Sequence, residues 1–329
     1  MAPRSLKLFP CLLAIAILPA SAQNDAALTA KLQSAIAGFH GKVSLYAKDL
    51  ATGQTVTLDA DQPVPTASVI KLTVLYTALQ QIRDGRVHFD DKLVLHKQDQ
   101  VPGSGVLLFF DTPLTLTLKD ALTLMIAVSD NTGTNLVIDH LGLKAIDSMI
   151  TAPPPTGLGL HNTWLYKKVY RPTEGPMPAD QPKFGLGKTT AREMASVMER
   201  FVDCKLGPRP QASATQSTTG ARPSGQEPSD KDLCDAAMHM LKVQQDREMI
   251  PRYLEAIDTS EKPSAIADKI GTLDHVRNDV GAVDTKHGTI IISAFTHDNA
   301  DTSWTADNKA ELLIAKMAKT IVDTWAPGS

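Results

Sequence analysis

The spacing of apolar residues near the start of the chain changes from a helical period to a strand period. Residues 28–38 place apolar side chains at the spacing of an amphipathic helix. Residues 42–50 and 54–60 instead alternate apolar and polar positions, and a short turn at 51–53, which ends in glycine, separates them. Two such runs joined by a short turn predict a β-hairpin.

The remaining pattern predicts mostly helices in the middle of the chain and strands near its end. A strongly apolar helix is expected from about Ser68 to Ile82, and Asp84-Gly85 ends it. Further helices are expected at 118–128, 132–141, 190–203 and 231–246. Strands are expected at 262–273, 276–284 and 288–298, followed by a helix at about 306–325.

This order of elements predicts an α/β (α+β) fold in which both ends of the chain contribute to one sheet. The sheet subdomain would comprise about 23–65 and 262–329, and an inserted, all-helical subdomain would comprise about 66–261. With 329 residues, the chain is long enough for one large domain or two intimately packed ones.

The first 22 residues, MAPRSLKLFPCLLAIAILPASA, have the pattern of a secretory signal. Two basic residues precede an apolar run from Leu8 to Leu18, and Ala20-Ser21-Ala22 forms a small-residue cleavage site. The alternative is a membrane anchor, but the apolar run is too short to span a bilayer. We therefore expect a mature protein that begins near Gln23, is periplasmic or secreted, and has no stable membrane anchor.

Export bears on the two cysteines that lie outside the signal segment. Cys204 and Cys234 flank a segment rich in Pro, Gly, Ser, Thr and Gln, and we expect a disordered loop at about 205–230. Cysteines on either side of such a loop in an oxidising compartment favour a disulfide, and two unrelated buried thiols are the alternative.

Composition and charge exclude several classes of function. A hydrophobic content of 43% and a charged fraction of 21% are typical of a globular protein. The net charge of -3 provides no basic field, so we expect no nucleic-acid partner. The nine histidines show no paired metal spacing, and the chain lacks both the Gly-x-Ser-x-Gly elbow and a dinucleotide loop, so we expect neither metal nor cofactor.

Ser68 and Lys71 are the first candidate catalytic pair. Residues at i and i+3 share a helix face, so the two side chains can approach each other. A lysine in apolar surroundings loses part of its preference for the charged state and can take the proton of a serine nucleophile. Ser-x-x-Lys is a weak motif, because about one copy is expected by chance in a chain of this length.

Two later motifs make this interpretation more specific. Ser129-Asp130-Asn131 interrupts two apolar helical segments, where a simple turn with a helix N-cap is the alternative. Lys269-Ile270-Gly271 lies on a late strand. Lys205-Leu206-Gly207 and Lys286-His287-Gly288 have the same spacing, but only Lys269 lies on an apolar strand with two further strands after it.

With these three motifs in this order, the chain resembles the penicillin-recognising serine hydrolases, specifically the class A β-lactamases, from about residue 28 to 326. The resemblance implies an antiparallel sheet with flanking helices. It implies that Ser68 is the nucleophile, Lys71 handles its proton and Ser129 relays a proton to the leaving nitrogen. Asn131 would hold a substrate amide, Lys269 would attract the substrate carboxylate, and the N–H groups of Ser68 and Thr272 would form the oxyanion hole beside Gly271.

The chain departs from the family pattern in two places. Ile270 occupies the middle of the third motif, where Thr or Ser is expected, and Thr272 is the nearest hydroxyl. The family sequence Thr-x-Leu-x-Arg-x-Glu corresponds here to residues 163–169, so Val169 stands where the glutamate that activates the deacylating water is expected. The nearest acid is Glu174, which would reach the site only if this loop is rebuilt.

Three functions remain possible at this point. The first is an exported class A-like β-lactamase, and the second is a serine hydrolase or peptidase acting on a peptide, amide or ester. The third is a catalytically weak penicillin-binding or sensor protein that is acylated and stays acylated. The expected partner is a small β-lactam or peptidoglycan-like substrate, and we expect a monomer.

Overall fold

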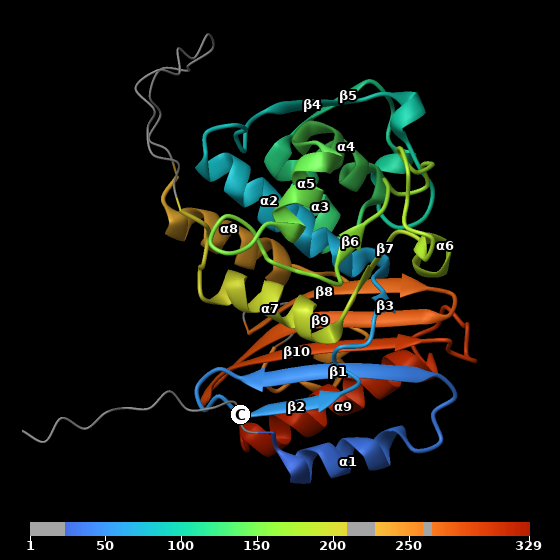
Figure 1. Ribbon diagram of the computed structural model, residues 1–329, viewed down its shortest axis with the longest axis vertical. Coiled ribbons are helices and arrows are strands. Elements are labelled where there is room, and N and C mark those ends of the chain that lie inside the picture. Colours follow the sequence, from blue (N-terminus) through green and yellow to red (C-terminus); the bar gives the residue numbers. More distant parts are fainter. Residues whose placement is uncertain (1–23, 209–227, 259–264) are drawn as a thin grey trace, which may run out of the picture.

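The computed structural model describes residues 24–208, 228–258 and 265–329. The predicted signal segment and most of the predicted 205–230 loop lie outside these residues. A five-stranded sheet in the order β2-β1-β10-β9-β8 forms the centre of the fold (Figure 1). Its strands are β1 (Lys42–Asp49), β2 (Thr55–Leu58), β8 (Ile266–Leu273), β9 (Val276–Thr285) and β10 (Gly288–His297).

All neighbouring strands of this sheet are antiparallel. Strand β1, from the start of the chain, pairs with β10, from its end, so that Lys42 lies opposite His297 and Asp49 opposite Ile290. The predicted sheet built from both chain ends is therefore present, and so is the predicted β1–β2 hairpin.

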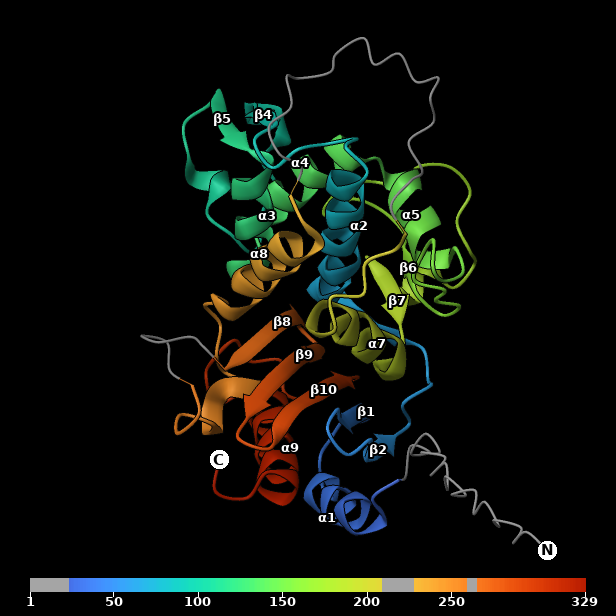
Figure 2. The same cartoon turned by 90° about the vertical axis from the view of Figure 1, so that its left-hand side faces the viewer.

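Helices cover both faces of the sheet, as Figures 1 and 2 show. Helices α1 (Ala26–Ile36) and α9 (Lys309–Trp325) lie on one face. Helices α7 (Ala191–Val202) and α8 (Asp230–Lys242) lie on the other, between the sheet and the remaining helices.

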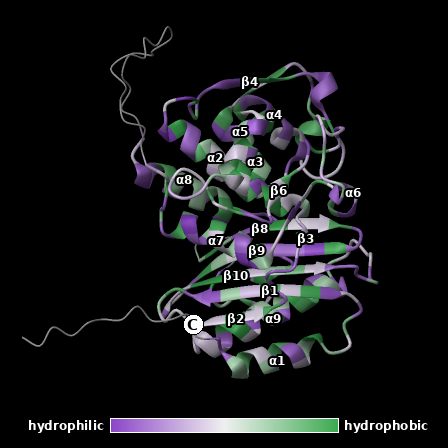
Figure 3. Cartoon of the chain, viewed as in Figure 1, coloured by the Kyte–Doolittle hydropathy of each residue, from purple (hydrophilic) through white to green (hydrophobic). Residues whose placement is uncertain are grey.

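The alternation of side chains along the strands separates two apolar cores. Ile290 and Ile292 of β10 are buried with α1 and α9, whereas Ile291 and Phe295 of the same strand are buried with the opposite helices. Successive strand residues point to opposite faces, so a continuous apolar run such as residues 290–292 contributes to both cores. In Figure 3, hydrophobic residues accordingly recur along the strands and α9.

The inserted region is built around helix α2 but is not all-helical, contrary to the prediction. Besides α7 and α8, its helices are α2 (Lys71–Arg83), α3 (Leu118–Ala127), α4 (Asn131–Leu141), α5 (Leu143–Thr151) and α6 (Gln181–Phe184). One small sheet pairs β4 (Lys92–Leu95) with β5 (Leu114–Thr117), and another has the order β3-β7-β6, with β3 (Val64–Pro65), β6 (Trp164–Leu165) and β7 (Gly187–Thr189). Short 3-10 turns complete it: η1 (Ala67–Ile70), η2 (Lys97–Asp99), η3 (Leu107–Phe109) and η4 (Ile250–Tyr253).

The end of helix α8 and the presence of helix α5 differ from the sequence prediction. Helix α8 ends at Lys242 rather than near 246, because the following residues bind the end of α3: Gln244 Nε2 donates to Ile126 O and Gln245 N to Ala127 O. Helix α5 was not predicted, although Ile146 and Ile150 carry its helical spacing. Gly142, at φ +88°, separates it from α4.

In the described residues, none of the helices has the length and apolar character that spanning a membrane requires. Within the same residues, no group of three or more acidic, histidine or cysteine side chains is arranged to hold a metal ion.

Candidate active site

Ser68 lies in η1, the 3-10 turn that directly precedes α2. The predicted helix therefore has Ser68 in a tighter first turn, and regular α-helix begins at Lys71. Ser68 is half-buried, and among the described residues its hydroxyl has no hydrogen-bond partner. The hydroxyl is thus free to meet a reactant.

Contacts from other elements hold this turn in place. Thr66 N donates to Gly187 O of β7 at 3.0 Å. Asn278 Nδ2 of β9 donates to Pro65 O at 2.9 Å and to Thr66 O at 3.2 Å. The serine is consequently positioned by strands that lie more than a hundred residues away in the sequence.

Lys71 is fully buried, and the hydrogen bonds of its amine within the described residues all go to the Ser129–Asn131 segment. Its Nζ lies 2.7 Å from Ser129 O, 3.1 Å from Ser129 Oγ and 3.1 Å from Asn131 Oδ1. Burial holds the pKa of Lys71 well below its usual value, and the nearby charge of Lys269 lowers it further. A neutral amine at this position can accept a proton.

The Ser129-Asp130-Asn131 segment is fixed by Asp130 as the N-cap of α4. The Asp130 carboxylate accepts hydrogen bonds from Gly133 N, Val106 N and Leu107 N. The sequence offered a simple capped turn or a catalytic loop as alternatives here, and the structure contains the cap. The same turn places Ser129, at φ +53°, against Lys71.

Lys269 is the second lysine that contacts Ser129. Its Nζ lies 3.0 Å from Ser129 Oγ and donates to Ile270 O at 2.8 Å. Burial lowers the pKa of Lys269 to about 8, while nearby Asp268 and Asp279 act in the opposite direction. The Ser129 hydroxyl therefore lies between two lysine amines, an arrangement suited to passing a proton.

Gly271 brings β8 against the turn that carries Ser68. A Cβ on Gly271 would lie 2.7 Å from Thr66 O and 3.0 Å from Ser68 N, so no larger residue fits without displacing backbone. Strand β8 thus approaches Ser68 at the residue before Thr272, and the N–H groups of Ser68 and Thr272 are the two predicted to form an oxyanion hole. Thr272 itself is half-buried.

Two carboxyl groups are buried on the other face of the sheet, behind Lys269. Asp268 and Asp279 are both fully buried, and neither Asp268 oxygen has a hydrogen-bond partner within the described residues. Burial raises the pKa of Asp279 to about 7 and that of Asp268 well above its usual value. Sequence analysis did not single out this pair, because their alternation with apolar residues is that of any strand.

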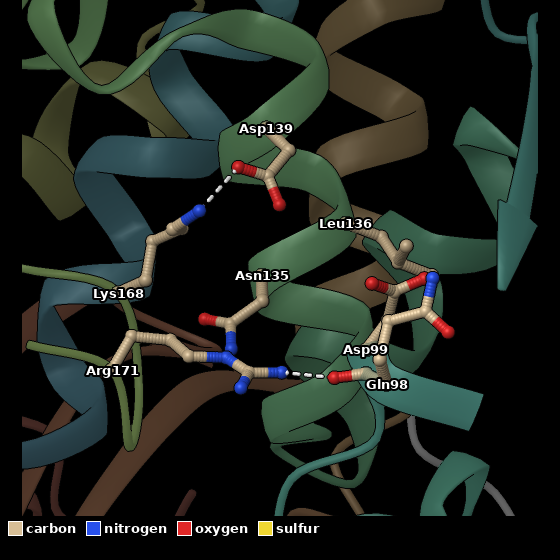
Figure 4. Close-up of a pocket in the computed structure, with 7 residues that line it drawn as sticks. All are labelled: Gln98, Asp99, Asn135, Leu136, Asp139, Lys168 and Arg171. Atoms are coloured by element: carbon tan, nitrogen blue, oxygen red, sulfur yellow. Dashed lines mark hydrogen bonds and ion pairs between the residues drawn. The ribbon is translucent and has the colours of Figure 1, made fainter. Parts of the chain in front are cut away.

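The 163–174 segment has a valine, Val169, at the position where the family pattern predicts an acidic residue. Val169 is only 8% exposed, and its backbone is held by Asn135 of α4: Val169 N donates to Asn135 Oδ1 at 2.8 Å, and Asn135 Nδ2 donates to Val169 O at 2.9 Å. Figure 4 shows Asn135 on α4 together with Lys168 and Arg171 of the 163–174 segment, which line the same pocket. Asn135 lies four residues after Asn131, a helical repeat of asparagines that could have marked it in the sequence.

Glu174 lies at the surface in this structure. Its side chain is 60% exposed and 3.6 Å from Lys168 Nζ, which also binds Asp139 Oδ1 at 2.7 Å. Among the described residues, Glu174 has no hydrogen bond or ion pair with the three candidate motifs.

The Cys204–Cys234 disulfide is present, which confirms the predicted pairing. Arg277 of β9 is fully buried: it forms an ion pair with Glu311 at 2.7 Å and lies over the Trp304 ring.

Comparison with solved structures finds the same fold. A β-lactamase from Sphaerobacter thermophilus superposes with a TM-score of 0.70 and 26% identity, covering 90% of this chain and 96% of that one. PBP-A superposes with a TM-score of 0.70 over 92% of this chain and 97% of that one, at 20% identity, which shows the fold alone.

Curated relatives match over shorter segments. The β-lactamase regulatory protein BlaB of Streptomyces cacaoi is 29% identical over 130 residues, 39% of this chain and 41% of that protein. The β-lactamase VEB-1 of Pseudomonas aeruginosa is 25% identical over 128 residues, 38% of this chain and 42% of that protein. The matches thus span about two fifths of the length of these relatives.

A sequence model described as the β-lactamase enzyme family matches residues 27–218 and 226–325, nearly the whole of the described chain. This match confirms the resemblance that the three motifs predicted. The chain belongs to the β-lactamase enzyme family.

Proposed function

We propose that this chain is an exported, class A-like serine β-lactamase that opens the β-lactam amide through an acyl-enzyme on Ser68. The observation that carries the proposal is the Ser129 hydroxyl, 3.1 Å from the Lys71 amine and 3.0 Å from the Lys269 amine. Lys71 follows Ser68 by three residues, and the Ser68 hydroxyl has no hydrogen-bond partner in the part of the chain that the structure describes. The predicted signal segment and the disulfide support export.

In the proposed acylation, the Ser68 hydroxyl attacks the lactam carbonyl carbon and Lys71 takes its proton. The N–H groups of Ser68 and Thr272 stabilise the negative oxygen. When the C–N bond breaks, Ser129 gives its proton to the leaving nitrogen and recovers one from Lys71. Lys269 attracts the substrate carboxylate, and Asn131 holds the substrate amide.

Deacylation requires that water attack the Ser68 ester, and the chain has fewer groups for this step than for acylation. Val169 has no group that could activate water, so we propose that the acyl-enzyme outlives its formation. This makes a slowly turning-over penicillin-binding protein the second candidate function. A PBP-A mutant carrying glutamate in place of a leucine is described as an acyl-enzyme complex with penicillin-G, which supports acylation by a penicillin on this fold.

The test is to mix the enzyme with benzylpenicillin and follow its intact mass over time. We expect an adduct with the mass of one penicillin to form quickly and decay slowly. Ser68→Ala should fold normally and form no adduct, since only one half-buried hydroxyl is lost. An adduct on Ser68→Ala would show that the nucleophile is misassigned.

A chromogenic cephalosporin added to the same preparation separates the candidates. A burst of about one equivalent followed by slow turnover is expected from the proposed mechanism. If neither an adduct nor turnover forms, the natural substrate is another amide or ester, and the β-lactamase proposal is wrong.

A further inference from the structure

The two buried carboxyl groups behind Lys269, those of Asp268 and Asp279, lie against each other. Asp268 is opposite Gly281 on β9, two residues from Asp279, so the two side chains are on the same face of the sheet. Both are fully buried and within hydrogen-bonding reach of each other. Lys269 follows Asp268 on β8 and therefore points to the opposite face, where it contacts Ser129.

The contact between the two carboxyl groups requires a shared proton. If both were ionised, two negative charges would lie together in the core, and neither group could donate a hydrogen bond. Three of their four oxygens, both of Asp268 and Oδ1 of Asp279, have no donor within the described residues. A proton on one carboxyl removes the repulsion and turns the contact into a hydrogen bond.

Asp279 is the member of the pair that ionises. Its Oδ2 accepts a hydrogen bond from Ile250 N at 2.9 Å, and such a bond stabilises the charged form of a carboxyl group. In the described part of the chain, no N–H group donates to Asp268. Burial raises the pKa of Asp279 to about 7, so above that pH the pair has one negative charge. Asp268 then holds the proton and donates it to the Asp279 carboxylate.

Charged groups from every neighbouring element surround the pair and Lys269. They are Asp246 and Arg247 after α8, Asp258 after η4, Arg277 on β9, Glu311 on α9 and Lys71 on α2. Asp258 lies 3.6 Å from Arg247, and Glu311 lies 2.7 Å from Arg277, so both of these acids are paired. Asp246 is half-buried, so solvent screens its charge more than it screens the fully buried pair.

We propose that the Asp268–Asp279 pair acts through Lys269 as a positioning element: its single negative charge, on Asp279, keeps the Lys269 ammonium charged and able to attract the substrate carboxylate. This inference rests on the proposed function, in which Lys269 has that role. Burial alone favours a neutral amine at Lys269. A buried anion on the far face of β8 opposes this effect without occupying the face that the substrate would contact.

The experiment compares two nearly isosteric variants, Asp279→Asn and Asp268→Asn. The rate of acylation by benzylpenicillin is measured by intact mass from about pH 6 to about pH 10. Asp279→Asn removes the ionised member and leaves Asp268 without a backbone donor, so Asp268 stays protonated and the negative charge is lost. Lys269 should then lose its proton more readily. We expect the decline of the rate at high pH to move to lower pH by about one pH unit, which makes acylation about fivefold slower at about pH 8.

Asp268→Asn is the matched control. Its amide donates a hydrogen bond to Asp279 in place of the carboxyl proton, so the negative charge is kept. The decline at high pH should therefore keep its wild-type midpoint. An equal change in both variants would assign the effect to altered packing and overturn the inference. Unchanged midpoints in both variants would overturn it too, because the charge of the pair would then have no effect on Lys269.

A measurement on the wild type covers the case in which Asp279→Asn does not fold. The protein is labelled with ¹³C at the aspartate carboxyl carbons, and their signals are followed by NMR as the pH rises. We expect one aspartate to titrate near pH 7 and a second to remain protonated there. If all aspartates of the folded protein are ionised by about pH 6, the pair holds no proton and the inference is wrong.

The two proposals fail in different ways. If benzylpenicillin labels the wild type at no pH, the proposed function is wrong, and the role of the pair in attracting substrate is wrong with it. If the wild type is labelled and Asp279→Asn shows the wild-type decline, acylation on Ser68 stands and the pair does not set the charge of Lys269.

Discussion

The two halves of the proposed reaction depend on regions that are built very differently. On the acylation side, the amines of Lys71 and Lys269 are buried and both contact Ser129. On the 163–174 side, the position nearest the expected water carries Val169, and the acid of that segment, Glu174, lies at the surface. Asn135 forms hydrogen bonds with the backbone of this segment, and Asp130 forms hydrogen bonds with backbone around Ser129.

This difference teaches that a loop can be held in place without providing a catalytic group. The two hydrogen bonds from Asn135 go to the backbone of Val169, so they are independent of the side chain at that position. A buried lysine, in contrast, is costly and persists only where its contacts compensate. Contacts around Ser129 therefore depend on particular side chains, whereas the contacts of the 163–174 segment with Asn135 fix only the course of the backbone.

The largest effect is expected from Lys71→Ala. Removing a general base typically slows a reaction by about 10²–10⁴-fold, so labelling by benzylpenicillin should slow by that factor. Rapid mixing and quenching, followed by measurement of the intact mass, gives the labelling rate. An unchanged rate would show that Lys71 is a buried lysine without a catalytic role. The Ser129 region and the 163–174 segment would then no longer differ in providing a base.

A smaller effect, of opposite sign, is expected from Val169→Glu. If the segment keeps its path, a carboxylate at this position can activate water, and the acyl-enzyme should decay at least about tenfold faster. Decay of the adduct mass after removal of free penicillin is the measurement. Val169→Gln is the control, since it has the same length and no base; equal acceleration by both would exclude base catalysis as the cause.

The pH dependence of acylation tests Lys269. With a pKa of about 8, its amine is charged below that pH and neutral above it. Acylation by a penicillin carboxylate should therefore fall as the pH rises through about 8, by up to tenfold per unit above it. The methyl ester of the same penicillin has no carboxylate to attract and should lack this decline; the same decline with the ester would assign the titration to another group.

The smallest effect is expected from Glu174→Gln. Glu174 is exposed and paired with Lys168, so the decay rate of the acyl-enzyme should change by less than about twofold. A loss of turnover in this variant would show that the segment rearranges to bring Glu174 to the ester. The residue-by-residue alignment that places Val169 opposite the family glutamate would then be wrong.

Much of the fold follows from local patterns in the sequence. Apolar residues that recur with a period of two predict the β1–β2 hairpin and the three C-terminal strands. A period of about 3.6 predicts helices α3, α4 and α7. Strands β3, β6 and β7 are two or three residues long and carry no such signal. They exist because pairing and burial stabilise them, which is also why the inserted region is not all-helical.

The sequence by itself supplied the candidate residues of the site, which are Ser68, Lys71, Ser129 and Lys269 in their order, the valine at 169, and two cysteines placed so as to favour a disulfide. Only the tertiary structure decided that Ser129 lies between two lysine amines and that Asn135 binds the backbone of Val169. These contacts join residues that are separated by about 30 to 140 positions in the sequence. The reason is physical: spacing specifies which side chains share a face of one element, but contacts between elements depend on how the two apolar cores pack around the sheet.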